Sequence, residues 1–136
     1  MKASSSTLQI AGPPETAYRK ISNFSALAEM MPPQVQDFKA TEDTCSFNVG
    51  GMAQINMRIS QKVEPSLVVI SSEDGSSFPF TLAFHFTPSE GGFGSVVEAE
   101  VNVNMIMAAM LKPQMQKFVD TLNRQIKTFC EAQPLG

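Results

Sequence analysis

The residue types that most often do chemistry are sparse in this chain and stand apart from one another. His85 is the single histidine, and Cys45 and Cys130 are far apart in the sequence, outside any Cys-x-x-Cys or Cys/His cluster. A zinc site needs three or four ligands, so these residues predict no metal centre. Both cysteines have apolar neighbours, which favours buried free thiols in a reducing compartment. His85 alternates with a row of phenylalanines, and we expect it on the solvent side rather than as a general base.

The paired carboxylates and the remaining polar candidates also lack the surroundings that a catalytic site needs. Glu98 and Glu100 are two residues apart, as an acid–base pair on one strand would be, but the pattern around them places both opposite the apolar side. Arg58 follows the same parity. The glycine-rich residues 91–94 precede a strand pattern rather than a helix, so they predict a flexible hairpin loop and not a phosphate cradle. Tyr18 belongs to no motif that assigns it a role. We therefore predict no catalytic residue, no cofactor and no metal.

Methionine is the residue type with unusual usage, at nine in 136 residues. Four of the methionines lie between residues 105 and 115, where a strand pattern passes into a helical one, and Met30 and Met31 end an earlier short helix. Methionine is flexible and polarisable, so it adapts to irregular shapes. The cluster is explained equally by contact with an apolar ligand and by a core that fills its own gaps.

Hydrophobic periodicity predicts the order of elements that would position these residues. Residues 6–11 alternate as a strand, and Pro13-Pro14-Glu15 then opens the first of two short helices, the second of which ends at Pro32-Pro33. Six further strands follow, with Gly50-Gly51 as a hairpin loop. They are expected at residues 35–40, 44–49, 52–63, 67–72, 78–87 and 95–104.

The strand alternation and the end of the chain together predict the architecture. Apolar residues occupy one side of the strands, as at Phe80, Phe84 and Val101, which is typical of an antiparallel sheet with one wet face. From about Leu111 the apolar spacing changes to three and four residues, which predicts a long amphipathic helix with Pro113 in its first turn or at a kink. This helix is the only element long enough to cover the sheet. We predict a single α+β domain over residues 1–136, with a curved antiparallel sheet of about seven strands wrapped around the helix, and a cavity between them.

Composition excludes several classes of protein. Hydrophobic residues make up 43% of the chain and charged residues only 17%, which is unlike a disordered protein. The net charge of −3 argues against a nucleic-acid partner. No apolar run reaches the ~20 residues that span a bilayer, and the first residues lack the apolar core of a signal peptide. These features predict a cytoplasmic protein without stable membrane insertion.

The element order resembles the START / birch-pollen-allergen superfamily with its helix-grip fold over essentially the whole chain. The similarity rests on the order of elements, on the opening Pro13-Pro14-Glu15-Thr16-Ala17-Tyr18 into Ile21-Ser22-Asn23-Phe24, and on Met31-Pro32. More narrowly, the chain resembles the bacterial polyketide cyclase/dehydrase and lipid-transport family (SRPBCC proteins). The resemblance implies binding of lipids, sterols, polyketides or other apolar molecules in the cavity, and in a minority of members cyclisation or dehydration.

Three functions from different classes follow, and the first is preferred. The chain is interpreted as a binding module for a lipid-like, polyketide-like or aromatic molecule, rather than a cyclase/dehydrase-type enzyme or a protein-interaction module. A homodimer is left open, because residues 67–70 are apolar at both parities. The expected ligand-binding residues are Phe47, Ile55, Met57, Phe80, Phe84, Val101 and Val103 on the sheet, Met107, Met115 and Val119 on the long helix, and Phe24, Leu27 and Met31 near the entrance.

Overall fold

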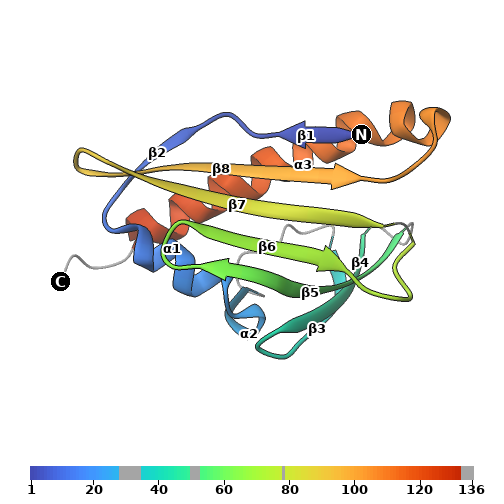
Figure 1. Cartoon of the computed structure of the whole chain (residues 1–136), viewed down its shortest axis with the longest axis horizontal. Helices are drawn as coiled ribbons and strands as arrows, with labels where there is room; N and C mark the ends of the chain where they lie inside the picture. The colour runs from blue at the N-terminus through green and yellow to red at the C-terminus, as the bar shows by residue number, and fades with distance from the viewer. Residues whose placement is uncertain (28–34, 50–52, 78, 133–136) are drawn as a thin grey trace.

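A computed structural model describes residues 1–27, 35–49, 53–77 and 79–132 of the chain. One antiparallel sheet runs in the order β1-β8-β7-β6-β5-β4-β3, and β2 also pairs with β8 (Figure 1). The strands are β1 (Lys2–Ser4), β2 (Leu8–Ala11), β3 (Val35–Ala40), β4 (Thr44–Val49), β5 (Ala53–Val63), β6 (Leu67–Ser72), β7 (Phe80–Ser89) and β8 (Gly92–Val101). The helices are α1 (Pro14–Ile21), α2 (Phe24–Leu27) and α3 (Met105–Ala132). The predicted α+β helix-grip architecture is confirmed.

The alternation of β7 shows how sequence determines which face is buried. Phe80, Leu82, Phe84 and Phe86 are all buried, while Thr81 between them and Thr87 after them are exposed. Their partners on β8 follow the same rule, since Phe84 lies opposite the buried Val97. Successive side chains of a strand point to opposite faces, so this one-sided pattern turns one face of the sheet toward the helices.

The first strand is divided into β1 and β2, which raises the number of strands to eight. Ser4 pairs with Glu98 and Leu8 pairs with Ser95. Between these two pairs the segment that joins β1 to β2 has one residue more than β8. At the break the Val97 N–H donates to Oγ of Ser5, at 2.9 Å, in place of a backbone acceptor. A serine hydroxyl thus compensates for the irregular ladder, which period-two alternation alone does not reveal.

The connection between β7 and β8 is tighter than the predicted loop over residues 88–94. Both strands continue through this region, with Pro88 opposite Phe93 and Ser89 opposite Gly92. Only Glu90 and Gly91 make the turn, and Gly91 has a φ of 78°, which glycine adopts without steric cost. The glycines of this segment therefore serve a two-residue hairpin, not a long flexible loop.

The last strand is also displaced from its predicted range, because it ends at Val101 rather than at residue 104. Asn104 instead begins α3: its side-chain oxygen accepts the N–H of Met107 at 2.8 Å, as an N-cap residue does. The helix begins at Met105, before its predicted start near Leu111, so Pro113 lies inside it and not in its first turn. The predicted loops at Gly50-Gly51 and Pro32-Pro33 lie outside the described residues.

The helices cover the apolar face unequally. The long helix α3 packs on β1, β2 and β8 with its buried residues Val119, Leu122 and Ile126. The short helix α1 packs on β6 and β7, and it also contacts α3 (Figure 1). The helix α3 therefore covers the inner face of the sheet at β1, β2 and β8. No described helix is long and apolar enough to cross a membrane.

Candidate functional site

The inner face of the sheet brings together most of the residues expected to bind ligand. They come from α2, four strands and α3, and all belong to one buried hydrophobic cluster. This set consists of Phe24, Phe47, Ile55, Met57, Phe80, Phe84, Val101 and Val119. Burial of this kind is what both a closed apolar site and a filled core require.

The other expected residues are placed differently. Val103 and Met115 are half-buried and pack against the cluster. Met107 is 41% exposed at the start of α3 and does not join the buried set. Met31 lies outside the described residues, and of Leu27 only the backbone, in α2, is described.

The geometry of the sheet separates this face into two parts. Phe47, Ile55 and Met57 lie on β4 and β5. The helix α3 packs on the same face but near the opposite edge of the sheet, on β1, β2 and β8. Phe47 and Ile55 are direct cross-strand partners, and Phe38 stacks on Phe47 with ring centroids 6.0 Å apart. An apolar surface thus continues along the sheet beyond the strands on which α3 packs.

A buried polar cluster anchors α3 to the sheet, and the sequence analysis missed it. Oγ of Ser95 donates to Oδ1 of Asn123 at 2.6 Å, while Nδ2 of Asn123 donates to Oγ of Ser5, at 3.0 Å. The same amide nitrogen lies 2.9 Å from the carbonyl oxygens of Ser6 and Ser95. The signal was present, because Ser95 shares the parity of Val97 and Asn123 lies on the apolar stripe of the helix. Its groups are paired with one another, which suits structural anchoring rather than catalysis.

Two further buried groups lack the reactivity that catalysis needs. Burial raises the pKa of the Cys45 thiol to about 12. Burial, reinforced by the charge of Glu131, raises the pKa of the Cys130 thiol to about 11. Both are free cysteines that stay protonated at neutral pH, and a thiol is a far weaker nucleophile than a thiolate. Lys20 is buried as well, with its Nζ 4.5 Å from the centroid of the Phe129 ring, a cation–π contact.

The polar residues considered as acid or base candidates lie on the outer face, as predicted. Nε2 of His85 is 2.7 Å from Oε1 of Glu98, and the two side chains are 43% and 31% exposed. Arg58 and Glu100 are exposed. No three histidine, cysteine or carboxylate side chains among the described residues come close enough to hold a metal ion.

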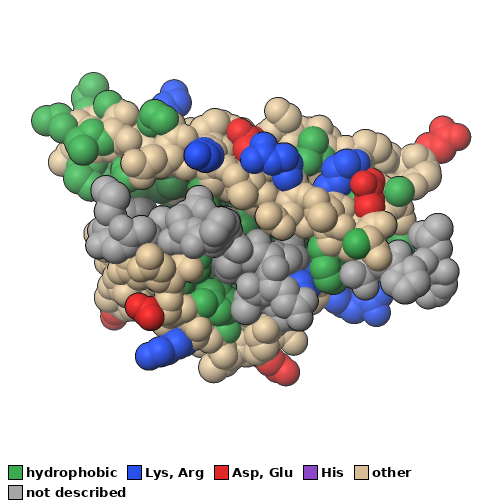
Figure 2. Space-filling model, turned by 180° about the vertical axis from the view of Figure 1, so that it is seen from behind, with side chains coloured by type: hydrophobic (Ala, Val, Ile, Leu, Met, Phe, Trp, Pro, Cys, Tyr) green, Lys and Arg blue, Asp and Glu red, His purple; other side chains and the backbone are tan. Residues whose placement is uncertain are grey.

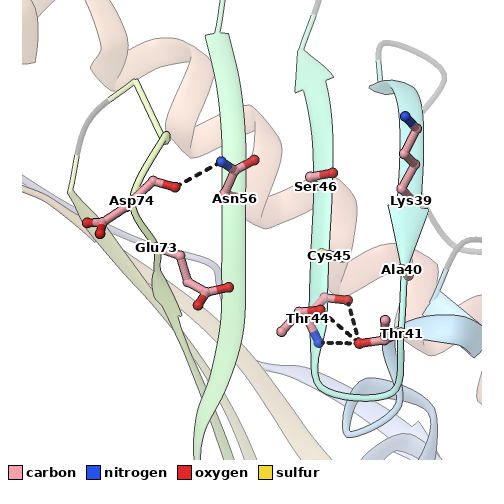
Figure 3. A pocket seen from close by; sticks show the side chains of 9 residues that line it. All are labelled: Lys39, Ala40, Thr41, Thr44, Cys45, Ser46, Asn56, Glu73 and Asp74. Atoms are coloured by element: carbon pink, nitrogen blue, oxygen red, sulfur yellow. Dashed lines mark hydrogen bonds between the residues drawn. The ribbon is translucent and has the colours of Figure 1, made fainter.

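A hollow of about 540 Å³ lies at β3, β4 and β5 (Figure 3). Lys39, Ser46 and Asn56 form a cross-strand row in it, opposite in parity to the buried Cys45 and Met57. The row therefore belongs to the outer face of the sheet. The remaining lining is Ala40, Thr41, Thr44, Cys45, Glu73 and Asp74.

The hydrogen bonds of this outer hollow are structural. Nδ2 of Asn56 donates to the backbone carbonyl of Asp74 at 3.0 Å, and the Thr41 and Thr44 hydroxyls are 2.8 Å apart across their turn (Figure 3). Its exposed charges are Lys39, Glu73 and Asp74, without a histidine or an ionised thiol beside them. We assign it no chemistry.

Comparison with known proteins identifies the fold. No protein-family model matches the sequence, and no curated protein matches it either. Among solved structures, a START superfamily protein from Mycobacterium smegmatis is 14% identical, with a TM-score of 0.71 over 96% of this chain and 97% of that one. The protein TTHA0849 from Thermus thermophilus is 17% identical, with a TM-score of 0.74 over 94% of this chain and 95% of its own.

A third similar structure belongs to a biosynthetic protein of two domains. The di-domain ARO/CYC BexL from the BE-7585A biosynthetic pathway is 16% identical, with a TM-score of 0.73. The match covers 98% of this chain and 51% of BexL. Together the three structures show that the chain has the START-like (SRPBCC) helix-grip fold, and at these identities they show the fold alone.

Proposed function

We propose that this START-like chain is a binding module for an apolar small molecule, lipid-like, polyketide-like or aromatic, held between the inner face of the sheet and α3. The observation that carries the proposal is the apolar inner face of β4 and β5, which continues beyond the strands on which α3 packs. Phe47, Ile55 and Met57 on this face are at most 7% exposed, so the site is enclosed, and a ligand held there would meet their apolar side chains. The two protonated free thiols support a reducing, cytoplasmic location.

The energetics of such a site do not require a charged anchor. A ligand that buries roughly 300 Å² of apolar surface gains about 7 kcal/mol before the costs of association. Side chains such as Phe47, Ile55 and Met57 supply contact area without a fixed polar pattern. The proposal therefore describes a site selective for size and apolar character rather than for one functional group.

An ARO/CYC-type enzyme that acts in the same space is the second candidate, because BexL shares the fold. Such an enzyme needs a general acid or base that faces its substrate. Among the described residues, the buried polar and charged side chains are Ser5, Lys20, Ser95 and Asn123. Three of these form the paired cluster that anchors α3, so binding without catalysis is the simpler function.

Substitution of Ile55 by tryptophan tests the proposal, because Ile55 is 7% exposed and faces the inner side of β5. If ligand occupies this space, Ile55→Trp fills it, weakens binding of the neutral fluorescent probe N-phenyl-1-naphthylamine about tenfold or more, and preserves the fold. If the space is ordinary core, overpacking instead lowers the free energy of unfolding by about 1–3 kcal/mol.

The matched control is Val63→Trp, which places the same side chain at a 45% exposed position of the same strand. It should change neither probe binding nor stability. Probe binding that is equal in wild type and Ile55→Trp would refute the proposed site.

A further inference from the structure

The start of α3 carries an apolar surface that the core does not use. Met105, Ile106, Met107 and Met110, here named the apolar tip, are 89%, 76%, 41% and 70% exposed. Among the described residues, the other large exposed hydrophobic side chain is Val63. Figure 2 shows hydrophobic side chains gathered at one end of the molecule. A cluster of four such residues is more than the scattered exposure expected of a soluble surface.

The apolar tip belongs to a formed helix. The N–H of Met107 donates to Oδ1 of Asn104 at 2.8 Å, and the N–H of Ala108 donates to the carbonyl of Asn104 at 2.9 Å. The first bond satisfies a donor that a helix N-terminus otherwise leaves open, and the second is the first backbone bond of the helix. The four side chains are therefore presented by a capped helical turn.

Helical periodicity shows that two residues of the apolar tip, Ile106 and Met110, point away from the core. Ile106 and Met110 are four residues apart and share one face of α3. At about 100° per residue, that face is roughly opposite to the one with the buried Val119, Leu122 and Ile126. Ile106 and Met110 therefore point to solvent and are free to contact a surface outside the chain.

The charge next to the apolar tip is positive, although the chain as a whole carries −3. From Met105 to Val119 the helix contains Lys112 and Lys117, both exposed, and no carboxylate. Arg124, about two helical turns after Lys117, is also positive and exposed. The next acid, Asp120, accepts a hydrogen bond from Gln116 at 3.2 Å. In Figure 2 lysine and arginine side chains follow the hydrophobic group along the same edge, with acidic ones among them farther along.

We propose that the apolar tip docks on the surface of a bilayer that contains anionic phospholipids, with the methionine and isoleucine side chains in the interface and Lys112 and Lys117 at the headgroups. Exposed apolar side chains beside lysines on one helix are the composition of an interfacial helix, which lies on a membrane and does not span it. Docking of this kind goes beyond the proposed function, because it needs no bound ligand.

A second copy of the chain fits this surface less well. Four side chains of this size expose on the order of 500 Å², below the roughly 800 Å² per partner of a stable interface. Two copies would also bring the same lysines together. A negatively charged lipid surface removes both objections.

Vesicle flotation tests the proposal with the intact protein. We expect the wild type to float with phosphatidylcholine vesicles that contain one quarter phosphatidylglycerol, to float far less with pure phosphatidylcholine, and to be released at about 0.5 M salt. The double variant Ile106→Ser/Met110→Ser should bind at least about tenfold more weakly, and Val63→Ser should bind as the wild type does. Lys112→Gln/Lys117→Gln should lose the preference for anionic vesicles, with Lys62→Gln as its control.

The outcomes separate the possible occupants of the surface. Equal flotation of wild type and the Ile106→Ser/Met110→Ser variant, or no flotation of the wild type, would overturn the proposal. A dimer by light scattering that the same variant converts to a monomer, without vesicle binding, would assign the tip to a second copy instead. Circular dichroism checks the fold, and Ile106→Ser alone, expected to weaken binding several-fold, replaces the double variant if that one unfolds.

Discussion

At the scale of single residues, Asn123 connects α3 to the sheet. Its amide bonds the hydroxyls of Ser5 and Ser95 and two backbone carbonyls, and it is 1% exposed. Removal of one partner from a buried network leaves the others desolvated and unpaired. The network therefore depends on this amide more than on either serine.

We expect Asn123→Ala to lower the free energy of unfolding by about 3 kcal/mol, because it leaves the two hydroxyls without this partner. Urea unfolding followed by circular dichroism measures the difference. Thr128→Ala, at an exposed position of the same helix, is the control and should change stability by less than about 0.5 kcal/mol. Equal stability of the two variants would show that the network contributes little.

At the scale of elements, the β7–β8 hairpin depends on adjacent glycines for different reasons. A Cβ on Gly92 would overlap the carbonyl oxygen of Ile10, because β2 lies close beside this position. A Cβ on Gly91 would meet open space, but the φ of 78° there is unfavourable for other residues. The first glycine of the turn is needed for its conformation, and the second for space.

We predict that Gly92→Ala destabilises the protein by about 3 kcal/mol through displacement of β2, whereas Gly91→Ala costs about 1 kcal/mol. Thermal unfolding of both variants compares them directly. Hydrogen exchange at Ile10 adds a local readout, since only Gly92→Ala should accelerate it. If Gly91→Ala proved the more damaging, close packing of β2 on the hairpin would be wrong.

The elements also show what periodicity can and cannot predict. Long regular hydrophobic patterns are sufficient to locate elements. The strands β3, β4 and β6 have the predicted bounds, and α3 is the expected long helix, although it begins earlier than predicted. The errors lie where a side chain or a glycine overrides the pattern, as at Ser5 between β1 and β2, at Gly91 in the hairpin and at Asn104 before α3. Parity predicted the outer position of His85 and Glu98, because a strand offers only two faces.

The site was less accessible to sequence reasoning than the fold. Parity identified the buried side chains of the inner face, but it does not report how far α3 extends across the sheet, which depends on three-dimensional packing. The partnered cluster of Ser5, Ser95 and Asn123 was overlooked because each residue looks ordinary alone. Residue type alone does not separate methionines 105, 107 and 110 from Met115, yet of these four Met115 packs against the core.

At the scale of the whole molecule, α3 serves both proposals. Its C-terminal part packs on β1, β2 and β8 and so bounds the inner face on the side away from β4 and β5, and its N-terminal turn carries the apolar tip. A chain that takes up apolar molecules and rests on a bilayer has its ligand source within reach. The two proposals are nevertheless separable, because vesicle binding by the tip and ligand binding at Ile55 are tested by different variants.

Native mass spectrometry of the purified protein, before and after incubation with a total lipid extract, tests the central claim most directly. The account predicts a species heavier than the 14.8 kDa chain by one apolar molecule, which organic extraction releases for identification. The Ile55→Trp variant should carry less of it, and Val63→Trp as much as the wild type. A bare chain mass in both samples would contradict a ligand site between the sheet and α3.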